Sequence, residues 1–440
     1  MNKKFVTALV ADADGNVFDL EGYAAVGWRG GIMSVLEEKD MIKTPFGSEV
    51  MFLPDRKPVL YNVLDNRIET LDENPFAPGE PIYPVAVFNS PGFVNTYTSA
   101  YEEKKDAGFL PLFPYGAVGW AGDFYVSAAF QVDDEPRQDL RLMPIEKVQK
   151  GVTNLKKKFP KNRLFKHITN CALVYGCPAA KNFFLARYEA PLPTSTTCNA
   201  RCLGCISLQS GAEIRSCQNR ITFVPTAQEI SEIALHHIAK VKKAVVSFGQ
   251  GCEGDPLFAA KVIIPAVKFI KKETDLGTVN MNTNASLPDV IEKLSEAGLD
   301  SIRVSMNSAR EKCYDAYFRP VSYTFDDVKK SIDIFGGNGG FISLNYLNCP
   351  GVTDSEKEAE ALMSFLSNHP VNFIQWRNLN FDPQRYYKMM KNIDDGGLPI
   401  GMDKVVAMVR AKFPHVGHGY FNPPKERFKA IAEHGEKIKM

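Results

Sequence analysis

Strand-length apolar runs alternate with longer, helix-like segments in the second half of the chain. The strand-like runs are residues 183–188, 244–248, 278–282, 301–306, 341–347 and 372–376. The helix-like segments between them are residues 227–240, 257–272, 287–297, 325–335 and 354–367. A connection of helix length returns the chain to the same end of the sheet, so consecutive strands run parallel. The alternation therefore predicts an α/β fold with a parallel sheet, either open or curled toward a barrel.

Residues 1–145 follow another pattern, with short strand-like runs between Gly and Pro turn signals. They predict an additional β-rich N-terminal domain. Residues 146–180 are expected to form a basic helical linker, because lysines and arginines crowd between positions 156 and 166. A solvated helix face explains these charges, and an RNA-contacting patch is the alternative. Residues 181–400 then hold the parallel sheet, and residues 401–440 form a C-terminal extension.

The composition limits where such a protein acts and on what. The 52 Lys and Arg residues nearly balance the 51 Asp and Glu residues, for a formal net charge of +1. This balance argues against a protein held to nucleic acid by bulk charge. No apolar stretch approaches the ~20 residues that span a bilayer. The nine cysteines are an odd number, and three of them fall within eight positions. We therefore expect a cytoplasmic protein with a metal site instead of a disulfide framework.

Cys198, Cys202 and Cys205 lie in the segment that follows the first expected strand. Loops at the carboxyl ends of parallel strands are where α/β proteins assemble their sites. Spacings of four and three residues let one loop place three thiolates around one metal centre. A structural zinc ion takes four ligands, and the second Cys pair or the His pair that would complete such a site is missing. A four-iron cluster held by three cysteines instead keeps one iron open for another ligand.

The motif Cys198-xxx-Cys202-xx-Cys205 after a first strand resembles the signature of the radical S-adenosylmethionine (radical SAM) superfamily. The resemblance covers roughly residues 181–380 and implies a partial (β/α)6 TIM-like barrel. It also implies a [4Fe–4S] cluster, reductive cleavage of S-adenosylmethionine to a 5′-deoxyadenosyl radical, and hydrogen abstraction from a substrate. A low-potential electron donor such as ferredoxin or flavodoxin is the implied partner. Gly204 departs from the family, which usually has an aromatic residue before the third cysteine.

A glycine-rich segment, residues 248–257, follows the second expected strand. Its glycines match the spacing of a dinucleotide-binding fingerprint. However, Pro256 biases the residue before it away from helical torsions, so no helix begins within the glycine run as that fingerprint requires. By resemblance, the segment is an expanded Gly-Gly-Glu loop, whose glycines let backbone carbonyls approach the ammonium group of the cofactor. The residues expected to bind the cofactor here are Gly249, Gly251, Glu253, Gly254 and Asp255.

Four of the expected strands alternate polar and apolar residues, although buried parallel strands are usually apolar throughout. Helices on the apolar faces leave the polar faces to line a wet lumen, which suits ribose hydroxyls, a carboxylate and a polar substrate. An antiparallel sheet with one solvated face is the alternative. By resemblance, the cofactor contacts on these faces are Asn282, Asn284, Arg303, Ser305 and Asn307. Gln375 and Arg377, on the sixth strand at the open side of a partial barrel, are the candidate substrate contacts.

The sequence does not identify the substrate. A peptide or a small metabolite is favoured over RNA, because only the linker is basic. Outside the superfamily, the alternatives are a non-catalytic iron–sulfur electron carrier and a dinucleotide-binding oxidoreductase. Cys171, Cys177 and Cys252 leave a second cluster open, although they lack the tight spacing of the first motif.

Overall fold

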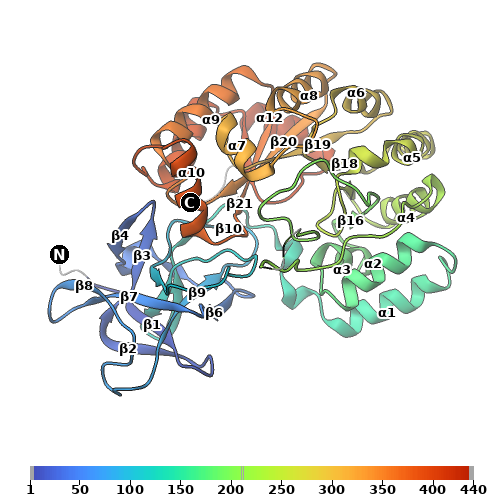
Figure 1. Ribbon diagram of the computed structural model, residues 1–440. Coiled ribbons are helices and arrows are strands. Elements are labelled where there is room, and N and C mark those ends of the chain that lie inside the picture. The colour runs from blue at the N-terminus through green and yellow to red at the C-terminus, as the bar shows by residue number, and fades with distance from the viewer. Residues whose placement is uncertain (1–3, 210, 212, 436–440) are drawn as a thin grey trace.

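A computed structural model describes residues 4–209, 211 and 213–435. A curled parallel sheet with helices on its outer face, a half-barrel, lies beside an antiparallel β-rich region (Figure 1). The first three residues of the expected N-terminal domain lie outside the described residues, as do residues 436–440 of the expected C-terminal extension. No helix in the described part of the chain is long and apolar enough to cross a membrane.

The parallel sheet has seven strands in the order of the sequence. Each strand pairs in parallel with the next. Its strands are β16 (Glu189–Pro191), β17 (Val245–Phe248), β18 (Thr278–Thr283), β19 (Ser301–Met306), β20 (Phe341–Asn348), β21 (Phe373–Asn378) and β22 (Gly417–Gly419). The predicted parallel α/β sheet is therefore confirmed, and the antiparallel alternative for this half of the chain is wrong.

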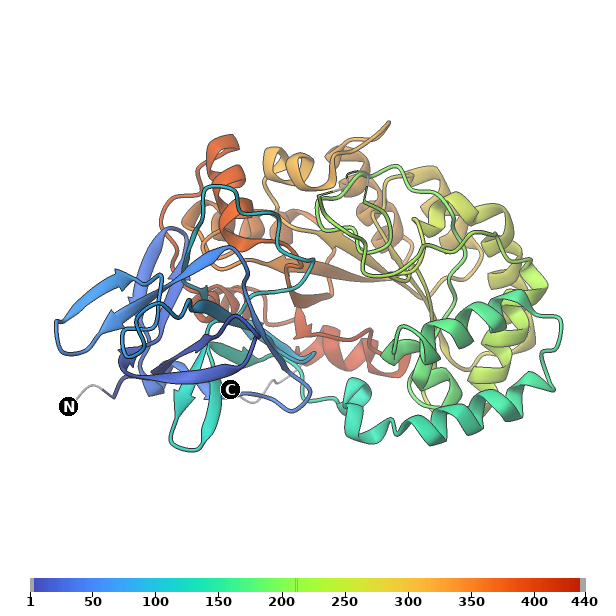
Figure 2. The same cartoon turned by 60° about the horizontal axis from the view of Figure 1, so that its bottom comes forward.

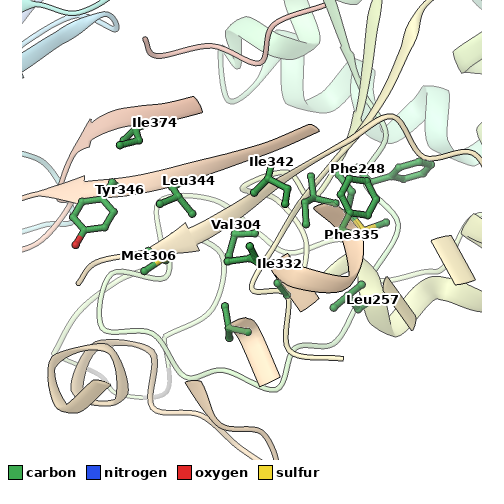
Figure 3. Packing of buried hydrophobic residues seen from close by; sticks show 14 of the residues in the cluster. Phe248, Leu257, Val304, Met306, Ile332, Phe335, Ile342, Leu344, Tyr346 and Ile374 are labelled. Carbon is green, nitrogen blue, oxygen red and sulfur yellow. The ribbon is translucent and has the colours of Figure 1, made fainter. Parts of the chain in front are cut away.

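Helices connect the strands, and most of them cover the apolar face of the sheet, whereas the helix after the last strand packs on Phe341 and Phe373 at the amino ends of β20 and β21. They are α4 (Ala227–Lys240), α5 (Ala260–Glu273), α6 (Pro288–Glu296), α7 (Glu311–Phe318), α8 (Phe325–Gly337), α9 (Glu356–Asn368), α10 (Pro383–Ile393), α11 (Met402–Lys412) and α12 (Phe428–His434). Figure 3 shows Ile332 and Phe335 of α8 close to Val304 of β19 and Ile342 of β20. These four side chains are fully buried. Burial of such side chains contributes ~1.5–3 kcal/mol each, so this layer stabilises the half-barrel.

Two strand predictions need correction. The first strand was expected at residues 183–188, but Phe183 and Phe184 end helix α3 (Pro178–Phe184), and β16 begins at Glu189. Both rings are buried against helices, where Phe184 makes an edge contact with Phe165, so their hydrophobicity reflects helix packing. The strand count of six was one short. The seventh strand, Gly417–Gly419, has the sequence Gly-His-Gly and no apolar pattern, and it removes β21 from the edge of the sheet.

The segment expected as a basic linker forms three packed helices. They are α1 (Ile145–Lys156), α2 (Arg163–Leu173) and α3. The cationic side chains between positions 156 and 166 are exposed, as expected for a solvated helix face. On the opposite face Leu164, Phe165 and Ile168 are buried in the same core cluster as the sheet and its helices. The segment is therefore packed onto the half-barrel (Figure 2).

The N-terminal region is built from short antiparallel strands, as predicted. They are β1 (Thr7–Ala11), β2 (Val17–Ala24), β3 (Val26–Arg29), β4 (Ile32–Val35), β5 (Ile42–Lys43), β6 (Glu49–Phe52), β7 (Arg56–Asn62), β8 (Arg67–Thr70), β9 (Tyr83–Phe88), β10 (Phe93–Asn95), β11 (Thr98–Ser99), β12 (Tyr101–Glu103), β13 (Val118–Ala121), β14 (Phe124–Ser127) and β15 (Ala129–Gln131). Short 3-10 helices lie at Glu38–Asp40, Pro136–Gln138, Leu140–Leu142, Pro256–Ala259 and Lys425–Arg427.

Buried polar contacts join the N-terminal region to the carboxyl ends of β20 and β21. The Asn95 amide N–H donates to Oδ1 of Asn378 at 2.9 Å, and Nδ2 of Asn348 donates to the Asn95 carbonyl at 2.9 Å. Asp382, just after β21, accepts from the Tyr101 hydroxyl at 2.7 Å and from Arg56 at 3.2 Å. A buried carboxylate held by two such donors fixes one surface against the other. The β-rich region is thereby anchored beside the end of the sheet where the loops gather.

Candidate functional site

The cysteine loop, residues 198–205, follows β16 and is pinned to the end of α7. The amide N–H groups of Arg201 and Leu203 donate to the carbonyls of Phe318 and Tyr317, at 2.9 and 3.0 Å. These two backbone hydrogen bonds fix the loop on both sides of its second cysteine, Cys202. The loop is therefore preorganised by the fold at the carboxyl end of the sheet.

The thiols of Cys198, Cys202 and Cys205 are all half-buried. Burial raises the pKa of Cys198 to about 12, and burial together with its two neighbouring thiols raises the pKa of Cys202 well above its usual range. A cation lies near the third thiol, because Nη2 of Arg220 is 3.6 Å from Sγ of Cys205. The thiols of Cys198 and Cys202 therefore stay protonated at neutral pH, so a metal that binds them must displace their protons.

Gly204 has no room for a side chain. A Cβ at this position would lie 2.7 Å from the Tyr317 hydroxyl and 2.9 Å from the Asn380 carbonyl oxygen. The departure from the aromatic residue expected before the third cysteine thus has a steric reason. The ring of Tyr317, buried on α7, lies next to the backbone of Gly204 instead.

The glycine-rich loop between β17 and Pro256 packs directly on the segment that leads into the cysteine loop. The Gly254 amide donates to the Ser195 carbonyl at 2.7 Å, and the Asp255 amide donates to the Thr197 carbonyl at 2.9 Å. A Cβ on Gly254 would lie 2.0 Å from the Thr197 oxygen. Gly249 has φ +75°, and a Cβ there would lie 1.7 Å from the Asn282 carbonyl oxygen. These glycines are required for close contact between backbones.

The two carboxylates of this loop bind the protein's own backbone. Glu253 accepts hydrogen bonds from the amides of Thr194, Ser195 and Gln250, at 2.7 to 2.9 Å. Burial raises the pKa of Glu253 and these hydrogen bonds lower it. Burial has the larger effect, so the pKa rises to about 7. Asp255 accepts from the Leu257 amide at 3.0 Å and the Asn284 amide at 2.7 Å. The described structure thus gives both carboxylates a positioning role within the loops.

Two features of the glycine-rich loop argue against the alternative of a dinucleotide-binding site. They are the contact made by Gly251 and the position at which the following helix begins. A Cβ on Gly251 would meet the Ile206 side chain at 2.6 Å, so this glycine faces the cysteine loop. Pro256 begins a 3-10 helix, and α5 begins only at Ala260. In the described structure, this helix therefore begins after the glycine run, whereas the dinucleotide fingerprint requires a helix that begins within it.

One group of polar residues on the strands forms a hydrogen-bonded network. Asn422, from the segment after β22, donates to Glu189 at 2.9 Å and accepts from Gln375 at 2.8 Å. Asn280 donates to Ser247 at 3.1 Å. The donors and acceptors of these side chains are largely used within the protein, so they hold the strands and the segment after β22 together.

Several other buried polar atoms, on β19, β20 and β21 or directly after β19, have no hydrogen-bond partner among the described residues. They are Nε of Arg303, Oδ1 of Asn307, Oδ1 of Asn345 and Nε of Arg377. Burial and the neighbouring Arg377 lower the pKa of Arg303 to about 9. Unsatisfied buried groups are costly, and in a concave site they indicate where ligand atoms bind. Arg303, Asn307 and Arg377, three of the predicted ligand contacts, therefore each carry a buried polar atom that a ligand could pair with.

The other residues expected to bind the cofactor, Asn282, Asn284 and Ser305, lie on or directly after β18 and β19. Nδ2 of Asn282 donates to the Gly249 carbonyl at 2.9 Å, and Nδ2 of Asn284 donates to Asn199 in the cysteine loop at 2.9 Å. Ser305 is half-buried on β19, opposite Asn345 of β20. Both asparagines thus couple β18 to the two loops.

Gln375 and Arg377, the candidate substrate contacts, are both hydrogen-bonded to other residues of the half-barrel. Gln375 is fully buried and accepts from Arg303 at 3.1 Å. Arg377 donates to the Tyr420 carbonyl at 2.8 Å and lies over the Tyr420 ring at 4.1 Å. Because β22 pairs with β21, these residues do not lie at an open edge, and that part of the prediction is wrong. The sequence analysis missed Asn422, because nothing in a short C-terminal segment signals that it enters the half-barrel.

Comparison with known proteins agrees with this geometry. Residues 192–363 match the family model of the radical SAM superfamily. The chain carries a radical SAM domain. The superfamily uses a [4Fe–4S] cluster and S-adenosylmethionine, so the domain is that of an enzyme. The match covers the cysteine loop and strands β17 to β20, whereas β16, β21 and β22 of the half-barrel lie outside it.

Solved structures with a partial resemblance to the chain include a radical SAM methyltransferase and an FeFe-hydrogenase maturase. A radical SAM methyltransferase from Sphaerobacter thermophilus is 15% identical, with a TM-score of 0.33 over 48% of this chain and 64% of that chain. The chain thus spans just under two thirds of that protein. Streptococcus suis SuiB is 13% identical, with a TM-score of 0.38 over 72% of both chains. The FeFe-hydrogenase maturase HydG from Carboxydothermus hydrogenoformans is 14% identical, with a TM-score of 0.36 over 68% of this chain and 74% of that chain.

The close contact at Gly254 makes a testable prediction about stability. Gly254→Ala should lower the free energy of unfolding by about 3 kcal/mol, because the new methyl group overlaps the Thr197 backbone and cannot be relieved by a side-chain rotation. Gly337→Ala is the matched control, since Gly337 is a helical residue with nothing within 4 Å of its Cβ position. Urea unfolding should show unchanged or slightly raised stability for the control. Equal stability of both variants would contradict the packing of the two loops.

Proposed function

We propose that Cys198, Cys202 and Cys205 hold three irons of a [4Fe–4S] cluster, and that the protein cleaves S-adenosylmethionine reductively to abstract hydrogen from a substrate. The observation that carries the proposal is the half-buried set of three thiols on one loop at the carboxyl end of a parallel half-barrel. Its match to the radical SAM family model supports the same chemistry.

The donor set fits a polynuclear cluster better than a single ion. Three ligand atoms around one tetrahedral zinc ion would lie ~3.6–3.8 Å apart, given bond lengths of ~2.0–2.3 Å. The three loop thiols are not drawn together in that way, since they do not all lie within 4.8 Å of one another. A cluster that binds each thiolate to a different iron spreads the sulfur atoms more widely and leaves its fourth iron open.

The chain's own residues supply the remaining parts of the site. When bound, the cluster provides the electron that cleaves S-adenosylmethionine to methionine and a 5′-deoxyadenosyl radical. Arg303, which is half-buried with an unpaired Nε, is suited to hold a carboxylate in a fork of hydrogen bonds. Asn282, Asn284, Ser305 and Asn307 are proposed to line the same cofactor pocket. Glu253 and Asp255 act as positioning residues, because they hold the two loops together.

A peptide or a small metabolite is the substrate class that the structure supports best. A cavity of about 490 Å³ borders Cys202 and Cys205, and its other walls include Phe109 of the N-terminal region and Arg385 of α10. This volume lies within the range of small-molecule sites. Its apolar and cationic lining suits an anionic, partly apolar molecule. A low-potential donor such as ferredoxin or flavodoxin is the proposed electron source.

The alternatives have weaker support. An RNA substrate rests on the exposed cations of α1 and α2, which lie on the solvated face of those helices. A non-catalytic electron carrier does not account for the unpaired polar atoms of Arg303, Asn307 and Asn345, since a carrier needs no ligand pocket. The alternative of a dinucleotide-binding oxidoreductase needs a helix that begins within the glycine run to bind phosphate, but here the helix begins only at Pro256.

The cluster assignment predicts the outcome of single cysteine substitutions. After anaerobic reconstitution with iron and sulfide, Cys198→Ala, Cys202→Ala and Cys205→Ala should each lose the four-iron absorbance, because each removes one of three anchors. Cys313→Ala is the control, since Cys313 is a buried thiol on α7 outside the loop. Iron and sulfide analysis provides the measurement. A Cys202→Ala variant with the iron content of the wild type would overturn the assignment.

The unpaired arginine atoms predict separate roles for the two side chains. Arg303→Met should weaken binding of S-adenosylmethionine about tenfold or more, the expected loss for a charge-assisted hydrogen bond. Arg377→Met should leave this affinity within about twofold, because Arg377 is assigned to the substrate. Equilibrium dialysis on the reconstituted variants measures both affinities. The opposite order of effects would exchange the proposed roles, and folded, cluster-containing protein in both variants is the condition for the comparison.

A further inference from the structure

A second group of metal-ligating side chains lies on the far side of the glycine-rich loop. His167 and Cys171 are one turn apart on α2, and Cys252 comes from the loop itself. Nε2 of His167 lies 3.4 Å from Sγ of Cys252 and 3.5 Å from Sγ of Cys171. The three ligand atoms all lie within 4.8 Å of one another. Both thiols are buried, and the imidazole is half-buried.

These distances match the coordination geometry of a single zinc ion. With bonds of ~2.3 Å to sulfur and ~2.0–2.1 Å to nitrogen, tetrahedral geometry separates a nitrogen and a sulfur ligand by about 3.6 Å. The two observed separations, 3.4 and 3.5 Å, are close to this value. The tight spacing also distinguishes the group from the wider set of thiols in the cysteine loop. A set of thiolate and imidazole ligands suits zinc, whereas magnesium and calcium prefer oxygen ligands.

A fourth ligand is available beside this group. Cys177 stands at the N-terminal cap of α3, and its amide N–H donates to the Cys171 carbonyl at 2.9 Å. Its thiol is not among the ligand atoms that all lie within 4.8 Å of one another, so it must move toward the other three to complete the set. A structural zinc site with one histidine and three cysteines is a common closed set.

We propose that His167, Cys171, Cys177 and Cys252 bind one structural zinc ion. The ion links α2 and α3 to the loop between β17 and Pro256. Cys252 directly precedes Glu253, whose carboxylate holds the amides of Thr194 and Ser195. The zinc ion would therefore fix the glycine-rich loop from outside, while Glu253 fixes it to the segment that leads into the cysteine loop. This role is independent of the chemistry at the cysteine loop.

The test must separate this site from zinc bound adventitiously by the cysteine loop. The full-length chain with Cys198→Ala, Cys202→Ala and Cys205→Ala together should still bind one zinc ion per chain. Mass spectrometry of the metal content, under reducing conditions and after extensive dialysis, gives the stoichiometry. Adding Cys252→Ser to this triple variant should abolish the bound zinc, whereas adding Cys313→Ser should leave it unchanged.

Cobalt substitution gives a spectroscopic readout of the ligand set in the same triple variant. Co²⁺ titrated into the triple variant should produce the absorption of a tetrahedral, thiolate-ligated ion, and one equivalent of Zn²⁺ should remove it. Cys177→Ser should weaken zinc retention against a chelator at least tenfold, and unchanged retention would overturn the four-ligand set. Zinc held equally with and without Cys252, or iron in place of zinc at this site, would overturn the proposal as a whole.

Discussion

Two loops pack backbone against backbone at the carboxyl end of the half-barrel, and the arrangement of the site depends on this contact. Gly254 allows the glycine-rich loop to approach Thr197, and the Glu253 carboxylate binds the amides of Thr194 and Ser195. A bulkier residue at position 254 would push the two segments apart. The cysteine loop is held in turn by hydrogen bonds to the carbonyls at the end of α7. The position of the three thiols thus depends on backbone contacts of the segment after β16 with the loop after β17 and with the end of α7.

Polar side chains on the strands of the half-barrel fall into two groups. In one group the polar atoms are paired within the protein, with Asn422 bound to both Glu189 and Gln375. In the other group some buried polar atoms are unpaired, on Arg303 and Asn345 among others. The first group therefore holds the fold together, and the second offers donors and acceptors to a ligand. The N-terminal region, anchored at Asp382, contributes Phe109 to the cavity that borders Cys202 and Cys205.

Strands and helices could be predicted where their polar and apolar residues follow the two faces of the element. The prediction was wrong where burial of a residue depends on segments distant in the sequence. Strands β18 and β19 alternate polar and apolar residues, and this alternation alone reveals both faces. Phe183 has the hydrophobicity of a strand residue but packs between helices, and the three residues of β22 carry no pattern at all. The role of Glu253 was also beyond prediction, since only the fold shows that its oxygens face backbone amides. His167 and Cys252 are 85 residues apart, so their proximity follows from the packing of α2 on the loop.

The central claim is that this site cleaves S-adenosylmethionine, and one assay addresses it directly. The anaerobically reconstituted full-length protein, reduced with dithionite and supplied with S-adenosylmethionine, should form 5′-deoxyadenosine and methionine in equal amounts, as measured by liquid chromatography and mass spectrometry. Formation should require both the reductant and the intact cluster. A protein that carries four irons and four sulfides per chain, yet forms no 5′-deoxyadenosine under these conditions, would contradict the account and favour an electron carrier.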